Sequence, residues 1–177
     1  VVQELERTKA ADREIVVVAG TTGTGFIDPE AATAIEYIHN GDTAIAGMQY
    51  SYLPSWISFM VDKEKAAASA TVIYQAVTAW WSQLPEDGRP RLIVFGESLG
   101  SYGSESSING TSVEASMRRI VEGADGVLWA GPTEPNPVWG QLIAAREPGT
   151  PVWRPVYDLS LIHISEPTRL LSISYAV

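Results

Sequence analysis

The 177-residue sequence contains no cysteine, only two histidines and no long apolar run. Without cysteine the chain has no disulfide, no thiolate metal ligand and no cysteine nucleophile. Its longest apolar runs, such as residues 15–19, are far too short to span a bilayer. The net charge of −9 is not accompanied by any stripe of basic residues, which argues against a nucleic-acid partner.

The composition that remains is typical of one globular domain. Hydrophobic residues make up 45% of the chain and charged residues 19%, and this length suffices to bury most of the apolar surface. The sequence starts with a helix-like "VVQELERTKAADR" and has neither an initiator Met nor a signal-peptide pattern. We therefore expect it to be a piece of a longer protein.

The last residues differ in pattern from everything before them. Residues 159–177, "LSLIHISEPTRLLSISYAV", resemble the translation of a sequencing-library adapter over eleven consecutive positions, 159–169. An amphipathic pair of C-terminal strands is the alternative. We predict a partial domain over residues 1–158 and a non-native tail over residues 159–177. Of the two histidines, only His39 then belongs to the domain, and His163 does not.

Apolar periodicity predicts alternating strands and helices. A continuous apolar β-branched run indicates a strand buried on both faces at residues 14–20. Further strands are expected at residues 43–53, 91–95 and 126–131, with a short strand at 151–158. Helices are expected at residues 28–41, 62–84 and 113–122 and directly after Ser98. This alternation predicts an α/β fold with a doubly wound, mainly parallel sheet.

The pentapeptide "GESLG" carries the main functional signal. Gly96, Ser98 and Gly100 match G-x-S-x-G directly between a predicted strand and a predicted helix, which is the setting of a nucleophile elbow. The crowded turn requires glycine two residues on either side of the serine. Leu99 would donate its backbone N–H to an oxyanion hole near a helix N-terminus. The alternative is a glycine-rich turn in which Ser98 has no catalytic role.

The loop after the first strand, "GTTGTGF", is the expected second side of that oxyanion hole. Thr21 and Thr22 are the candidate N–H donors. The glycines of this loop also fit a dinucleotide pattern, G-x-x-G-x-G. However, the next helix begins only near Pro29, too late to face a pyrophosphate, and the following strand lacks the acidic residue that binds a ribose. These features disfavour a nucleotide cofactor.

Three stretches, residues 20–56, 84–105 and 126–139, together resemble the catalytic region of a bacterial α/β-hydrolase family of membrane proteins. The resemblance covers most of residues 5–158. It implies the α/β-hydrolase fold, here incomplete at both ends, with Ser98 at the nucleophile position and residues 21–25 at the oxyanion side. It also implies a parent protein in which transmembrane helices precede the hydrolase domain and associate it with a membrane. The polar stretch "SSINGTSVEASM" departs from the family pattern.

If residues 159–177 are a non-native tail, the sequence lacks the histidine of a catalytic triad. In this fold the chain order is serine, acid, histidine, so both partners should follow Ser98. His39 precedes it, and His163 lies in the predicted tail. Asp158 ends a predicted strand and is a candidate for the acid, but the resemblance places it earlier in the chain than the family's acid. Asp125 precedes a strand, on the wrong edge of the sheet. We therefore expect this fragment to be inactive.

Three aromatic residues, Tyr50, Tyr52 and Trp56, follow the second predicted strand and either line a substrate cleft or cap the core.

The sequence favours a serine hydrolase that cleaves a small-molecule or lipid-like ester through an acyl-serine, without metal or cofactor. Two alternatives remain open. One is an acyltransferase that uses the same serine, and the other is a non-catalytic binding or assembly module of a membrane protein.

Overall fold

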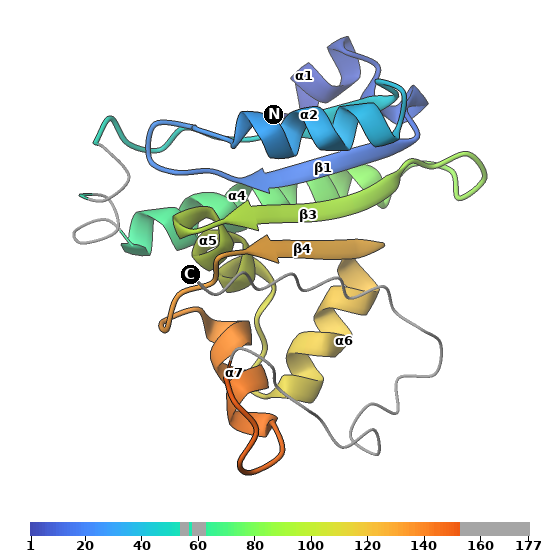
Figure 1. Cartoon of the computed structure of the whole chain (residues 1–177). Coiled ribbons are helices and arrows are strands. Elements are labelled where there is room, and N and C mark those ends of the chain that lie inside the picture. Colours follow the sequence, from blue (N-terminus) through green and yellow to red (C-terminus); the bar gives the residue numbers. More distant parts are fainter. Residues whose placement is uncertain (54–56, 58–62, 153–177) are drawn as a thin grey trace.

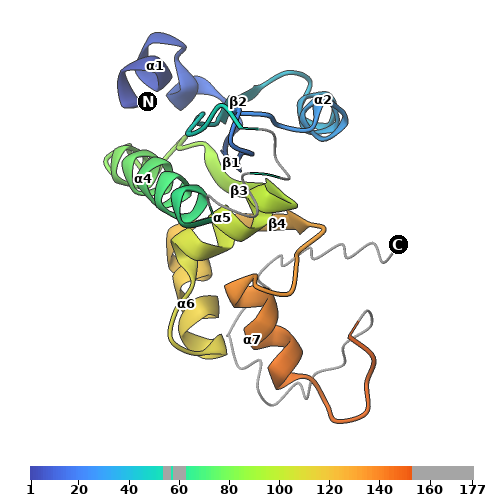
Figure 2. The ribbon, with the colours of Figure 1, turned by 90° about the vertical axis from the view of Figure 1, so that its left-hand side faces the viewer.

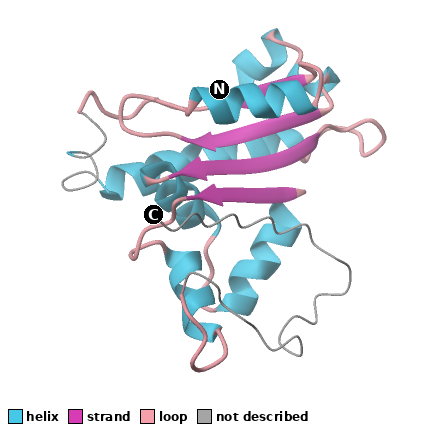
Figure 3. Cartoon of the chain, viewed as in Figure 1, coloured by secondary structure: helices cyan, strands magenta, loops and turns pink. Residues whose placement is uncertain are grey.

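The structure is a computed structural model that describes residues 1–53, 57 and 63–152 (Figure 1). The elements are α1 (Val2–Arg7), η1 (Ala10–Asp12), β1 (Ile15–Gly20), α2 (Pro29–Ile38), β2 (Thr43–Ala46), α4 (Lys63–Trp81), β3 (Arg91–Glu97), α5 (Leu99–Ile108), α6 (Val113–Gly123), β4 (Gly126–Ala130) and α7 (Pro137–Ala145). Figure 3 distinguishes the helices, strands and loops in the same view.

The four described strands form one parallel sheet in the order β2-β1-β3-β4. The register pairs Gly20 with Gly96 and Glu97 with Ala130. The carboxyl ends of β1, β3 and β4 therefore meet at one edge of the sheet, which is where this class of fold binds its ligands. The predicted parallel α/β sheet is confirmed.

Helices cover both faces of the sheet (Figure 2). On one face, Val16 and Val18 of β1 pack in a core with Ile73 and Val77 of α4. On the other face, alternate β1 residues such as Val17 form a core against which α2 packs. Since β1 is buried on both faces, its sequence is a continuous apolar run rather than an alternating one.

Local signals explain the ends of α2. The Asp28 side chain accepts a hydrogen bond from the Ala31 N–H at 2.8 Å, and Pro29 occupies the first helical turn. Asn40 (φ 51°) and Gly41 (φ 74°) then reverse the chain. Both ends of this helix agree with the prediction.

Two segments differ from the prediction. The second strand ends at Ala46 instead of residue 53, because the N–H groups of Tyr50 and Ser51 donate to the Gly23 carbonyl, at 3.1 and 2.7 Å, and not to the sheet. Helix α7 was not predicted, although Asn136-Pro137 is a normal helix start. The expected strand at 151–158 falls almost wholly outside the described residues.

Candidate active site

Ser98 sits at the turn between β3 and α5 in a strained backbone conformation. Its φ of 51° and ψ of −118° are far from the conformations that L-residues favour, and such a residue costs about 1–3 kcal/mol. Its N–H donates to the Ala130 carbonyl at 3.0 Å, which ties the turn to the end of β4. The residue is exposed at the carboxyl edge of the sheet. This is the geometry expected of a nucleophile elbow.

Three glycines let α5 pack directly on the sheet. A Cβ on Gly100 would lie 2.1 Å from the Gly20 carbonyl oxygen, and a Cβ on Gly20 would lie 2.2 Å from that of Gly100. A Cβ on Gly96 would meet Ser104 Oγ at 2.4 Å. The sequence pattern explained Gly96 and Gly100 by this crowding, but it gave no indication that Gly20 is the opposing surface.

The predicted oxyanion donors lie on either side of this contact. Leu99 is the first residue of α5, and an N–H in the first turn has no acceptor inside its own helix. The Thr22 N–H donates to the Phe26 carbonyl at 3.3 Å within its loop. The Thr21 nitrogen is only 3.5 Å from where a Cβ on Gly100 would stand. The Thr22 N–H is thus already used within its loop, and the role of Leu99, Thr21 and Thr22 as oxyanion donors stays a prediction.

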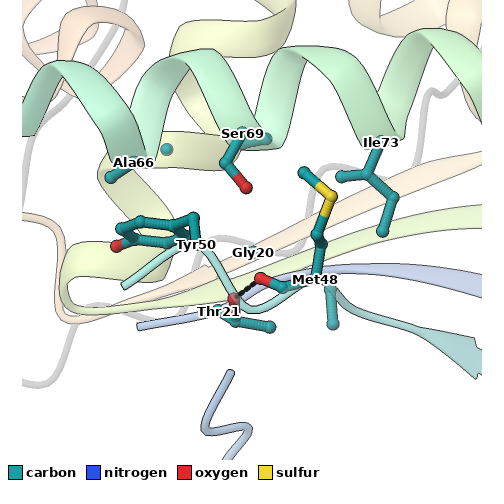
Figure 4. A pocket seen from close by; sticks show the side chains of 10 residues that line it. Gly20, Thr21, Met48, Tyr50, Ala66, Ser69 and Ile73 are labelled. Carbon is teal, nitrogen blue, oxygen red and sulfur yellow. Dashed lines mark hydrogen bonds between the residues drawn. The ribbon is translucent and has the colours of Figure 1, made fainter. Parts of the chain in front are cut away.

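A small pocket opens between the end of β1, helix α4 and the segment after β2 (Figure 4). Tyr50 lines it, and Thr21 Oγ1 donates to the Met48 carbonyl at 2.7 Å at its floor. Ser98 is not among the lining residues. Tyr52 is 87% exposed, and Trp56 lies outside the described residues. Of these aromatic residues, Tyr50 alone is seen to line the pocket, and a cleft shared with Trp56 stays a prediction.

A carboxylate, Glu97, precedes Ser98 directly. Partial desolvation raises the pKa of Glu97, the neighbour of Ser98, and the negative charges of Asp28 and Glu30 at the start of α2 raise it further. In residues 1–53 and 63–152 no group of three or more metal-ligating side chains comes together.

His39 lies far from the elbow. It follows α2, and its Nδ1 contacts Glu14 Oε1 at 3.0 Å, the same oxygen that accepts from Arg91 Nη2 at 2.7 Å. Arg91 begins β3 and Ser98 follows its end, so this cluster is about 20 Å from Ser98 at a strand rise of ~3.3 Å per residue. His39 is the one histidine among the described residues, and it cannot serve Ser98 as a base.

Of the two aspartates considered as a triad acid, the structure describes only Asp125. Asp125 Oδ2 accepts the Leu92 N–H at 2.7 Å, near the amino ends of β3 and β4, as its place before a strand predicts. Asp158 and His163 lie outside the described residues.

The Glu14 cluster makes stability depend on pH. Its hydrogen bond to His39, and then that to Arg91, holds the pKa of Glu14 below its usual value. A depressed folded-state pKa adds stability that is present above the unfolded pKa and is lost as pH falls through the folded pKa. We expect Glu14→Gln to lower the urea midpoint at pH 7, by an amount that shrinks towards pH 3.

The matched control is Glu6→Gln, which removes an exposed carboxylate of α1 that takes no part in this cluster. A Glu14→Gln deficit that stays constant between pH 7 and pH 3 would contradict the linkage.

A parallel sheet that presents a strained serine at its carboxyl edge, on a glycine-packed turn into a helix, defines the α/β-hydrolase class of fold. A family model described as an alpha/beta-hydrolase family matches residues 1–171, and the chain belongs to this family. No curated protein matches it. The match includes residues 159–171, so the non-native origin of the tail stays a prediction. No helix in the described part of the chain is long and apolar enough to span a membrane.

Proposed function

We propose that the protein is a serine hydrolase that cleaves ester bonds, with Ser98 as its nucleophile. The observation that carries this proposal is the backbone of Ser98 at an exposed strand-to-helix turn. Its φ of 51° and ψ of −118° are unfavourable, and residues in such strained conformations cluster at active sites. Membership of the alpha/beta-hydrolase family supports a hydrolytic activity.

In the proposed reaction, Ser98 Oγ attacks the acyl carbon while a histidine takes its proton, and the resulting oxyanion accepts hydrogen bonds from the N–H groups of Leu99 and Thr21. The alcohol leaves with the proton that the histidine returns, and water then hydrolyses the acyl-serine. Transfer of the acyl group to an alcohol instead of water would make the protein an acyltransferase. No step needs a cofactor.

We further propose that the acid and the histidine come from a later segment of a parent membrane protein, and that the substrate is a small-molecule or lipid-like ester. The 177-residue chain alone should then be inactive. A second candidate function, a non-catalytic binding module, is favoured by one observation: the described residues place no histidine on the Ser98 edge.

Labelling with a fluorophosphonate probe, mapped by peptide mass spectrometry, tests these proposals. We expect the chain extended by its natural downstream sequence to be labelled at Ser98, and Ser98→Ala to lose the label. The 177-residue chain should react at least ~10³-fold more slowly. An extended protein that is not labelled at Ser98 would support the binding module.

The two histidines of the 177-residue chain provide a matched pair of variants. His39→Ala should leave any labelling unchanged, because this side chain lies at the opposite edge of the sheet. If the 177-residue chain is labelled efficiently and His163→Ala abolishes the label, then His163 is the base and the predicted non-native tail is wrong.

A further inference from the structure

A buried carboxylate lies two turns beyond Ser98 in α5. Glu105 is 1% exposed. Its Oε1 accepts from Asn136 Nδ2 at 2.7 Å, and its Oε2 accepts from the backbone N–H groups of Val138 and Trp139, both at 2.9 Å. A buried charge is tolerated only when it is fully hydrogen-bonded, and all of these partners are donors. These donors stabilise the ionised form of Glu105 against the cost of its burial.

Glu105 acts as the N-terminal cap of α7. This helix begins at Pro137, and the Asn136 side chain makes no capping bond to it. The Glu105 carboxylate instead takes the N–H groups of the first turn and meets the positive end of the helix dipole. Burial raises the pKa of Glu105 above its usual value, and the donors Trp139, Asn136 and Val138 offset this only in part. The carboxylate thus fixes where α7 starts relative to α5.

The same network continues to the elbow. Asn136 Oδ1 accepts from the Thr133 N–H and hydroxyl, both at 2.9 Å, which sets the orientation of the amide. Asn136 Nδ2 donates to Ser101 Oγ at 2.9 Å, and Ser101 Oγ donates to the Ser98 carbonyl at 2.6 Å. A hydroxyl has one hydrogen. Because Ser101 accepts from Asn136, its hydrogen is directed to Ser98.

The Ser98 carbonyl is held from several sides. Besides Ser101 Oγ, it accepts the N–H groups of Ser101 at 3.0 Å and Tyr102 at 3.2 Å. A strained residue persists only when its surroundings over-determine its conformation. We propose that Glu105 is a positioning residue for the nucleophile: through Asn136 and Ser101 it fixes the Ser98 carbonyl and the backbone that presents the Ser98 hydroxyl. Its catalytic meaning rests on the proposed function.

A purely structural role for Glu105 would be to attach α7 to the domain, and Gln141 offers the comparison. Gln141 Oε1 accepts from Ser116 Oγ at 2.6 Å and its Nε2 donates to the Gly110 carbonyl at 2.8 Å. It therefore ties α7 to α6 and to the loop after α5, and none of these bonds reaches the elbow. Gln141→Glu places an acceptor against the Gly110 carbonyl and serves as the matched control.

The test is amide hydrogen exchange of the 177-residue chain carrying Glu105→Gln. Glutamine has one acceptor oxygen where the carboxylate has two, so one donor of the network must face an NH₂ group. We expect the amides of Ser101 and Tyr102 to exchange at least ~10-fold faster relative to the β1 amides, which report global unfolding. Gln141→Glu should leave this ratio unchanged.

Ser101→Ala supplies a second test if Glu105→Gln fails to fold, because it removes only the hydroxyl that contacts Ser98. It should speed exchange of the Ser101 and Tyr102 amides on its own. The double variant should add nothing at the elbow beyond Glu105→Gln, since both act through one network. The proposal is overturned if Ser101→Ala leaves these amides unchanged, or if Gln141→Glu speeds their exchange as much as Glu105→Gln does.

Activity separates this inference from the proposed function. In a labelled, catalytically competent protein, Glu105→Gln should lower kcat about 10-fold or more with KM nearly unchanged, as expected of a group that acts only on the reacting serine. If Ser98 is never labelled but the exchange pattern holds, the proposed function fails and the positioning of Ser98 stands. If labelling succeeds and exchange is unaltered, the positioning role fails.

Discussion

We expect Gly100→Ala to destabilise the domain by roughly 3 kcal/mol or more, because overpacking against backbone has no easy relief. The new Cβ would lie 2.1 Å from the Gly20 carbonyl oxygen and 2.8 Å from its carbon. Both are backbone atoms of β1, so no side-chain rotation relieves the contact. The gain in helix propensity from alanine, about 1 kcal/mol, is too small to offset it. Urea unfolding followed by tryptophan fluorescence measures the change.

Gly140→Ala is the matched control for this prediction. Gly140 also lies in a helix, α7, but a Cβ there meets nothing within 4 Å. The same substitution should therefore stabilise the protein by about 0.5–1 kcal/mol. Gly20→Ala approaches the contact from the opposite side, at 2.2 Å, and should resemble Gly100→Ala. Equal effects of Gly100→Ala and Gly140→Ala would mean that α5 does not rest on the β1 backbone.

The parts of the fold that sequence predicts are those encoded locally. A run of β-branched residues buried on both faces identifies β1, and Asp28-Pro29 identifies the start of α2. The end of β2 is different, because it depends on the Gly23 carbonyl of a distant loop. Helix α7 has a local start signal in Asn136-Pro137, but its N-terminus is capped by Glu105 of α5, a contact that the local sequence does not encode.

The site divides in the same way. The G-x-S-x-G spacing is enough to predict the Ser98 turn, since the strain and the crowding arise within a few residues. The opposing Gly20 and the buried Glu105 are separated from their contacts by long stretches of sequence. The polar sequence around Glu105 does not predict that this glutamate is buried. Its burial follows from the packing of α7 against α5.

The strained backbone of Ser98 should lower the stability of the domain, and replacing this serine by glycine tests that expectation. A Cβ at φ 51° and ψ −118° is unfavourable, so glycine should relieve about 1–3 kcal/mol of strain. Glycine also has more conformational freedom in the unfolded chain, and this offsets roughly 0.5–1 kcal/mol of the stabilisation gained by relieving the strain. We expect Ser98→Gly to raise the free energy of unfolding by about 1 kcal/mol, measured by urea unfolding.

Ser98→Ala distinguishes strain from the loss of the hydroxyl. Alanine keeps the Cβ and therefore the strain, so its stability should remain close to that of the wild type. In a competent enzyme both variants should lose ester hydrolysis by ~10⁴-fold or more, because neither has a nucleophile. If Ser98→Gly is no more stable than Ser98→Ala, the turn stores no strain and the main support for the nucleophile is lost. If Ser98→Gly is more stable than the wild type but inactive, the strained conformation that exposes the Ser98 hydroxyl lowers the stability of the domain.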